Sequence, residues 1–192
     1  MKDNNMKREF HFFLLTDYEA EEELLRKRNQ QGYKFKSVAV PGIYTFEKCE
    51  PEDVIYKLDF NELTATDLAG YQQIYEDYGW EYITQMNDYS YFKKPAKDVK
   101  KEAEAEIFSD SESKLDMLNK IFWKKMIPVF LIFLLCGMPL TMQLLENIFT
   151  GSFSSIREGV TLLWSPIVLL YLYVFVHCII GFVRLRKKYM NE

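Results

Sequence analysis

The chain has 192 residues, of which 48% are hydrophobic, and a formal net charge of −4, a length that favours one compact domain with appendages. Its charge is unevenly spread, because residues 1–95 hold 12 Lys and Arg against 18 Asp and Glu, whereas residues 114–192 hold 9 against 4. An acidic N-terminal part repels phosphate backbones and therefore excludes nucleic acid as an expected partner.

The N-terminus shows no sign of export. Met1 to Glu9 is polar and charged and lacks the apolar core of a cleavable signal peptide, so we expect membrane insertion to come from segments further along. Cys49, Cys136 and Cys178 form no CxxC pair and predict neither a disulfide framework nor a zinc site. We expect a reducing cytosol and no metal or cofactor.

The first half of the soluble part predicts the order strand, helix, strand, strand. An apolar, aromatic strand is expected first, followed by a helix that a capping box, Thr16-x-x-Glu19, opens and Gly32 ends. A hairpin turning at Pro41-Gly42 completes this half. The expected ranges are Glu9–Leu15 for the first strand, about Thr16–Gln31 for the helix, and Tyr33–Val40 and Ile43–Cys49 for the hairpin.

The second half repeats this order. A strand over Val54–Phe60 precedes a helix that Thr64-x-x-Asp67 caps and Gly79 ends, and a hairpin through Asn87-Asp88 closes the unit. Gly32-Tyr33-Lys34-Phe35 aligns with Gly79-Trp80-Glu81-Tyr82, which indicates an internal repeat. Trp80 follows a helix-ending glycine and opens an inner strand, so we expect it in the core.

Two such units predict an α+β domain over residues 1–95, with one antiparallel sheet and both helices on one face, akin to ferredoxin-like domains. The other sheet face is then free, and an exposed apolar face marks a partner or ligand site. Half-buried strand residues are the favoured interpretation, because tyrosine favours strands in any case. The candidates for this face are Tyr44, Tyr56, Tyr82, Tyr89 and Tyr91.

The order of these segments resembles a bacterial family, the domain of unknown function 2812 (DUF2812). The resemblance covers about Glu9 to Pro95, and its most specific parts are Tyr78-Gly79-Trp80-Glu81-Tyr82 and Tyr91-Phe92-Lys93-Lys94-Pro95. It implies a membrane-helix pair after the domain and genes beside PadR-type regulators, and hence envelope or stress regulation in Gram-positive bacteria. It implies no catalytic residue.

Residues 96–125 form a charged connector. Lys97–Phe108 is rich in helix formers, with Lys100 and Glu104 one turn apart. After Ser109, Ser113 and Asp116 are expected to cap an amphipathic helix that lies at a membrane surface. A simple spacer and a helix that couples the domain to the membrane both fit this pattern, and a spacer is favoured.

Residues 126–192 predict a transmembrane hairpin with a basic tail. Two uncharged runs, 126–145 and 160–183, are each long enough to cross a hydrocarbon core. Lys and Arg flank the outer ends of the pair, which predicts a cell-membrane protein with both termini in the cytoplasm and contact with the lipid bilayer. The helices also offer a route to a homo-oligomer.

Three residues within these runs are candidates for more than anchoring. Pro139 and Pro166 each remove a backbone donor and predict kinks, although prolines are common in membrane helices. His177 is a titratable group at membrane depth, where a hydrogen bond to the other helix is favoured over proton transfer.

The sequence offers little for catalysis. The two histidines, His11 and His177, are far apart in the predicted structure, and no phosphate-binding loop is present. The acidic run Glu19, Glu21, Glu22 and Glu23 is typical of a solvated helix face rather than a metal site. We therefore expect a membrane-tethered binding or regulatory module that recruits a protein partner and is no enzyme. The alternatives are a small-molecule sensor or accessory subunit of an envelope transporter, and an enzyme that acts on lipid or envelope precursors.

Overall fold

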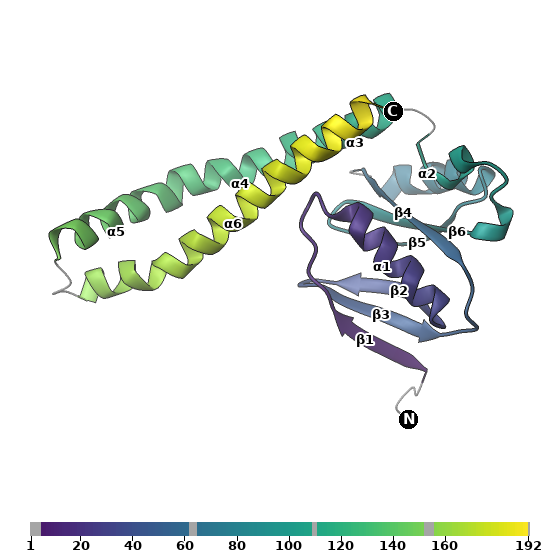
Figure 1. Ribbon diagram of the computed structural model, residues 1–192, viewed down its shortest axis with the longest axis horizontal. Coiled ribbons are helices and arrows are strands. Elements are labelled where there is room, and N and C mark those ends of the chain that lie inside the picture. Colours follow the sequence, from purple (N-terminus) through teal and green to yellow (C-terminus); the bar gives the residue numbers. More distant parts are fainter. Residues whose placement is uncertain (1–4, 62–64, 109–110, 152–155, 192) are drawn as a thin grey trace. The chain divides into compact units, whose positions relative to one another are not determined.

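The computed structural model describes residues 5–61, 65–108, 111–151 and 156–191, and the chain divides into two compact units, Met1–Met117 and Leu118–Asn191. Both contain regular structure (Figure 1). The first unit contains β1 (Met6–Phe10), α1 (Tyr18–Gln30), β2 (Tyr33–Ala39), β3 (Ile43–Lys48), β4 (Val54–Phe60), α2 (Ala65–Asp77), β5 (Glu81–Met86) and β6 (Tyr89–Pro95).

The strands of the first unit form two antiparallel sheets of three strands each. The first sheet has the order β1-β3-β2 and the second has the order β4-β6-β5. In each sheet the pairing slips at corresponding points, between Phe35 and Ser37 in β2 and between Tyr82 and Thr84 in β5. The two halves thus have the same strand order. The α+β class is confirmed, and the prediction of one continuous sheet is wrong.

The two helices lie on opposite faces of the second sheet, not on one face as predicted. Tyr56 and Tyr91 point to α1, where their hydroxyls bond Asn29 and Glu21. Ile55 and Phe92, their neighbours in the chain, pack instead against Tyr71 and Tyr75 of α2. Because side chains alternate along a strand, these contacts require helices on both faces. The burial of nearly all of β4 follows from this double cover.

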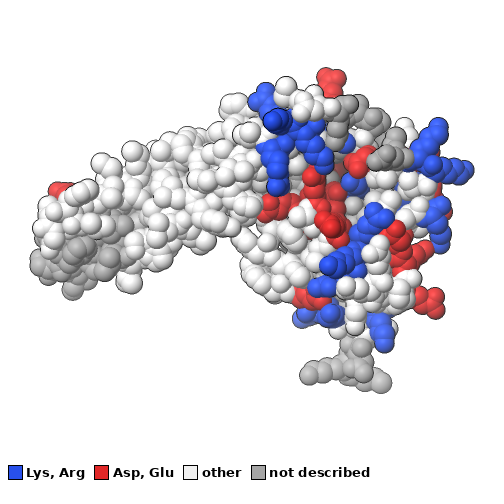
Figure 2. All heavy atoms as spheres, in the orientation of Figure 1, with Lys and Arg blue, Asp and Glu red and all other residues white. Residues whose placement is uncertain are grey.

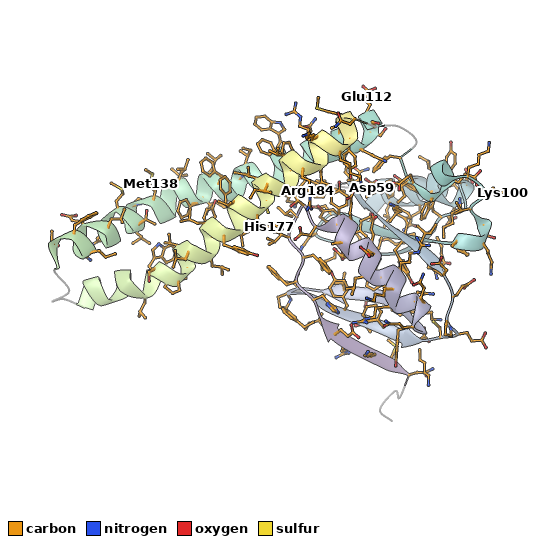
Figure 3. All side chains as sticks on the ribbon, viewed as in Figure 1. Asp59, Lys100, Glu112, Met138, His177 and Arg184 are labelled. Carbon is orange, nitrogen blue, oxygen red and sulfur yellow. The ribbon has the colours of Figure 1, made fainter. Side chains whose placement is uncertain are left out.

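Polar contacts tie α2 to its face. The hydroxyls of Tyr71 and Tyr75 donate to Asp59 Oδ2 of β4 at 2.5 and 2.9 Å, and Figure 3 labels Asp59 on this sheet. Trp80 is buried beside Ile55 and Phe92, which confirms its predicted place in the core. The capping box predicted at Thr64 lies outside the described residues.

The start of the first half differs from the prediction. β1 ends at Phe10, so residues 11–15 are not strand, and α1 begins at Tyr18 with Asp17 as its cap. Asp17 Oδ2 accepts a hydrogen bond from the Leu14 backbone, whereas the buried Thr16 hydroxyl has no hydrogen-bond partner among the described residues. Asp17 and not Thr16 is thus the N-cap residue, and its carboxylate bonds the turn before α1 and makes no capping hydrogen bond to the helix.

The predicted turns are confirmed. Gly32 and Gly79 have left-handed φ angles of 84° and 79°, and Asn87 and Asp88 have φ angles of 50° and 67°. Two successive residues of positive φ are the geometry of a tight two-residue hairpin. Both halves therefore end their helix on glycine and their hairpin on a short turn.

The connector contains less helix than its composition suggests. Residues 96–105 form two 3₁₀ turns, Ala96–Asp98 and Glu102–Ala105, and Glu104 accepts its bond from the Lys100 backbone. α3 (Ser111–Ile121) follows and crosses the boundary between the units. It begins at Ser111, two residues before the predicted cap at Ser113, and buries Leu118 and Ile121.

The second unit is a pair of antiparallel helical arms. One arm consists of a π-helical segment (Phe122–Met126), α4 (Ile127–Ile132), a second π-helical segment (Phe133–Gly137) and α5 (Met138–Thr150), and the other is α6 (Ile156–Met190). Ring contacts pair Phe122 with Phe182 at 4.8 Å and Phe133 with Tyr171 at 4.1 Å. The residue numbers rise on one arm as they fall on the other, so the arms run in opposite directions.

The π-helical segments each precede a proline. Pro139 has no N–H for the Leu135 carbonyl, and the helix around Leu135 is π-helical. The arm bends by 46° between Leu135 and Met138, in line with the kink predicted at Pro139. By contrast, α6 continues through Pro166 as one helix.

One helix of this unit, over Leu163–Met190, is long and apolar enough to cross a membrane. The bent arm adds a second candidate only if Ser111–Leu135 and Met138–Thr150 form one span. In Figure 2 most of the helix pair is free of Lys, Arg, Asp and Glu. These features agree with membrane association.

Candidate functional site

The five tyrosines predicted on a free sheet face do not form one. Tyr44, Tyr56, Tyr89 and Tyr91 are 1–7% exposed, and Tyr82 is half-buried against Phe92. The hydroxyls of the four buried tyrosines bond to α1 and to the segment before it. Tyr44 and Tyr91 donate to Glu21, Tyr56 donates to Asn29, and Tyr89 donates to the Leu15 carbonyl. Of the two interpretations of these tyrosines, burial in the domain agrees with the structure, and an exposed tyrosine surface does not.

An open face does exist, on the first sheet. Its outward side chains come from β1 and β3, where the pairing places Phe10 beside Ile43. These two and Met6 are exposed, and so are Phe12 and Val40 at the end of the sheet. An exposed sheet face was predicted, but on the five tyrosines, because the prediction assumed one continuous sheet.

Three of the five tyrosines meet in a pocket instead. The pocket has a volume of about 250 Å³ and lies where the segment His11–Leu15, the turn Val40–Gly42 and the turn at Asn87 come together. Tyr44, Tyr89 and Tyr91 line it, whereas Tyr56 and Tyr82 do not. The loss of strand pairing after Phe10 frees His11–Leu15 to form one wall. We take this pocket, the Glu21 pocket, as the candidate site.

Glu21 is the carboxylate of this pocket. Its Oε1 accepts hydrogen bonds from the Tyr44 and Tyr91 hydroxyls at 2.6 and 2.7 Å. Burial raises the pKa of Glu21 because it penalises the charged form, and the two tyrosine bonds oppose this effect in part. Burial beside Glu21 also raises the pKa values of Tyr44 and Tyr91, so both phenols stay protonated donors.

Glu22, the next residue of α1, joins a second buried network. Its Oε1 accepts the Leu58 backbone N–H of β4 at 2.9 Å, and its Oε2 bonds Lys57 Nζ at 3.0 Å. Lys57 Nζ also bonds Glu106 of the connector at 2.9 Å. Burial raises the pKa of Glu22 to about 7, although Lys57 and the Leu58 amide lower it. The network thus links α1, the edge of the second sheet and the connector.

A third charged cluster lies beside the pocket on β1. The Glu9 carboxylate contacts Lys7, His11 and Arg28 at 2.7–2.8 Å. Burial alone raises the pKa of Glu9, but the three hydrogen bonds outweigh it and lower the value to about 2. His11, a pocket residue, is therefore already engaged with a carboxylate.

A second pocket, of about 640 Å³, lies between α2 and the connector. Lys94 fills part of its wall, with Nζ 5.6 Å from the Trp80 ring centre and bonded to the carbonyls of Tyr78 and Glu104. This ammonium already has aromatic and carbonyl partners, so we regard this pocket as the weaker candidate.

Sequence reasoning placed Glu21 and Glu22 on a solvated face, and both are buried. A signal was present: Tyr18, Leu25 and these two glutamates recur at three- and four-residue spacing, which puts them on one side of a helix. Among the described residues no group of three or more His, Cys, Asp or Glu side chains is placed to hold a metal ion.

The candidate residues of the second unit lie apart from one another along the arms. Pro139 opens α5, whereas Pro166 and His177 belong to α6, on which Figure 3 labels His177. The His177 ring lies 6.1 Å from that of Tyr173 on the same helix. These three residues do not form a common site.

Comparison with known proteins supplies a family. The family model described as "Protein of unknown function (DUF2812)" matches residues 17–132, more than half of the chain. The chain belongs to DUF2812. The match starts within the first half of the domain and extends through the connector into α4, so it reaches further than the predicted 9–95. No curated protein and no solved structure matches the chain.

The pKa of Glu22 predicts a pH dependence of stability. Its folded value of about 7 exceeds its ordinary value of 4.5, so the stabilising contribution is complete below pH 4.5 and is lost as the pH rises through 7. At about 1.4 kcal/mol per pKa unit, the loss is about 3 kcal/mol. Hydrogen exchange of β4 and α1 in the full-length protein, corrected for intrinsic rates, should show this decline and a flatter profile for Glu22→Gln.

Glu23→Gln is the matched control, because Glu23 is an exposed carboxylate on the same helix. Its profile should follow that of the wild type. If the Glu22→Gln profile also runs parallel to the wild type from pH 4.5 to pH 8, the pKa of Glu22 is not raised.

Proposed function

We propose that this DUF2812 protein is a membrane-anchored binding and regulatory module with no catalytic role, and that the Glu21 pocket is its binding site. The observation that carries the proposal is an aromatic pocket that contains one buried carboxylate. Pockets lined mainly by apolar and aromatic side chains, with few polar groups, are typical of small-molecule sites. The pocket favours a small-molecule sensor over a module that binds a protein partner through the five tyrosines.

Adjacent residues of α1 offer a route from the pocket to the connector. Glu21 faces the pocket, and Glu22 bonds Lys57, which bonds Glu106. A ligand that shifts α1 would therefore change the contacts of both Lys57 and the connector segment. Glu106 also lies 3.8 Å from Lys114 at the start of α3. This chain of ion pairs supports a regulatory role for ligand occupancy.

A second candidate function is recruitment of a protein partner. The observation that favours it is the open face of the first sheet, where Met6, Phe10 and Ile43 are exposed together. The role of accessory subunit in an envelope transport system belongs to this candidate. Exposed apolar side chains on the helical arms also offer a contact surface for a second copy of the chain in a homo-oligomer.

The proposal includes two membrane spans with both termini in the cytoplasm. Two features support this topology. The arms contact each other in antiparallel directions, and basic residues gather at the end of the pair where the Phe122 ring contacts the Phe182 ring. Basic residues near a span favour the cytoplasmic side. These residues are Lys120, Lys124, Lys125, Arg184, Arg186, Lys187 and Lys188.

Cysteine labelling tests this topology. In a chain whose three cysteines are replaced by alanine, a single cysteine is placed at Lys97, Phe149 or Lys187, which lie before the first arm, near the end of α5 and near the end of α6. A membrane-impermeant maleimide should label Phe149→Cys in intact cells, and the other two variants only after permeabilisation. Labelling of Lys97→Cys and Phe149→Cys from the same side would leave α6 as the single span.

The binding role predicts a co-purifying small molecule. Full-length protein, extracted from its native membranes in mild detergent, should release an enriched compound that mass spectrometry detects. Met86→Trp, which fills the pocket from the end of β5, should release at least tenfold less of it. Tyr78→Trp is the control, because Tyr78 is exposed and lines the second pocket but not the Glu21 pocket.

The results separate the two pockets. Loss from Met86→Trp alone supports the Glu21 pocket, and loss from Tyr78→Trp alone would move the site to the second pocket. The same amount from all three proteins would show that neither pocket holds the compound.

A further inference from the structure

The walls of the Glu21 pocket are rich in aromatic rings. Ring contacts of 5.7–6.2 Å join Tyr44 to His11 and to Phe13, and Tyr91 lies 5.2 Å from Phe35. The faces of such rings carry partial negative charge and attract cations within about 6 Å. The aromatic residues among the pocket's lining are His11, Phe12, Phe13, Tyr18, Tyr44, Tyr89 and Tyr91.

Glu21 adds to this environment a carboxyl group that is negatively charged when it is deprotonated. The residue is 6% exposed and lines the pocket, and both tyrosine hydroxyls bond the same oxygen, Oε1. Its second oxygen, Oε2, accepts no hydrogen bond from the described residues. Because Glu21 lines the pocket, this oxygen can accept a hydrogen bond from a ligand, and a hydrogen bond to a carboxylate is stronger than one between neutral groups.

We propose that the Glu21 pocket binds a small organic ammonium ion, with the ammonium at Glu21 Oε2 and an apolar group against the aromatic walls. This inference rests on the proposed function of the pocket as a binding site, and it names the class of ligand.

The size of the pocket sets the size of the ligand. A cavity of ~150 Å³ is enough for benzene, so about 250 Å³ accepts one ring with a short alkylammonium chain. Phe12 and Val40 line the pocket and are 64% and 70% exposed, which suits an apolar end that reaches the opening.

The charge of the domain favours a cation as well. Residues 1–95 carry 12 Lys and Arg against 18 Asp and Glu, and an excess of negative charge raises the local concentration of cations. The imidazole of His11, the basic group among the lining residues, is bonded to Glu9 and so does not compete for Glu21. An anionic ligand would meet Glu21 with like charge.

Titration calorimetry on the full-length protein in lipid nanodiscs tests the proposal, with empty nanodiscs as the blank. The probes are phenethylammonium and its neutral analogue of similar shape, phenethyl alcohol. Phenethylammonium should bind at least tenfold more tightly than the alcohol. Glu21→Gln should lose at least tenfold in affinity for the ammonium, whereas Glu23→Gln, the same change at an exposed site on α1, should bind as the wild type does.

A second measurement does not depend on the folding of a variant. The affinity of the wild type for phenethylammonium should fall by at least tenfold as acid protonates Glu21, while the affinity for phenethyl alcohol should stay constant over the same pH range.

Two results would overturn the inference, and they differ in whether the pocket is still supported as a binding site. Equal binding of both probes, lost together in Met86→Trp, would retain the pocket as a binding site and refute its preference for cations. Binding of neither probe, with no compound co-purifying from native membranes, would remove the inference together with the proposed role of the pocket.

Discussion

The hydrogen bonds of Glu21 link α1 to both sheets of the first unit. One carboxylate oxygen on α1 accepts the hydroxyl of Tyr44 from the first sheet and that of Tyr91 from the second. No strand pairing joins the two sheets, although β2 lies beside β5 and the Phe35 ring contacts those of Tyr56 and Tyr91. Hydrogen bonds to charged groups are worth about 1.5–3 kcal/mol each. α1 therefore helps to join the two three-stranded sheets into one core, beside the direct contacts of β2 with the second sheet.

The neighbours of Glu21 on α1 extend the same role. Glu22 satisfies the Leu58 N–H on the edge of β4, and Asn29 accepts the Tyr56 hydroxyl and donates to the Glu52 carbonyl. An unpaired strand edge otherwise invites pairing with another chain. A helix with a buried polar stripe thus protects one edge, joins two sheets and forms the floor of a pocket. Structure and binding share these side chains, which explains why the pocket carboxylate is so deeply buried.

The helices, strands and turns could be predicted from the sequence where the conformational preferences of a few neighbouring residues determine them. Gly32, Gly79 and Asn87-Asp88 adopt positive φ angles that few other residues tolerate, and β4 matches its predicted range residue for residue. The arrangement of the sheets was not readable, because side-chain alternation in β4 fits a strand buried on both faces as well as one buried on a single face. The pairing of Tyr44 and Tyr91 with Glu21 is a contact between residues 23 and 70 positions apart, which no local pattern reports.

Hydrogen exchange of the wild-type protein tests the role of α1 most directly. If α1 joins the sheets into one core, the slowest amides of β2, β3, β4 and β6 should share one free energy of opening and one dependence on denaturant. Opening of the first sheet at a clearly lower free energy than the second would show that each half is stable without the other, and would contradict the account.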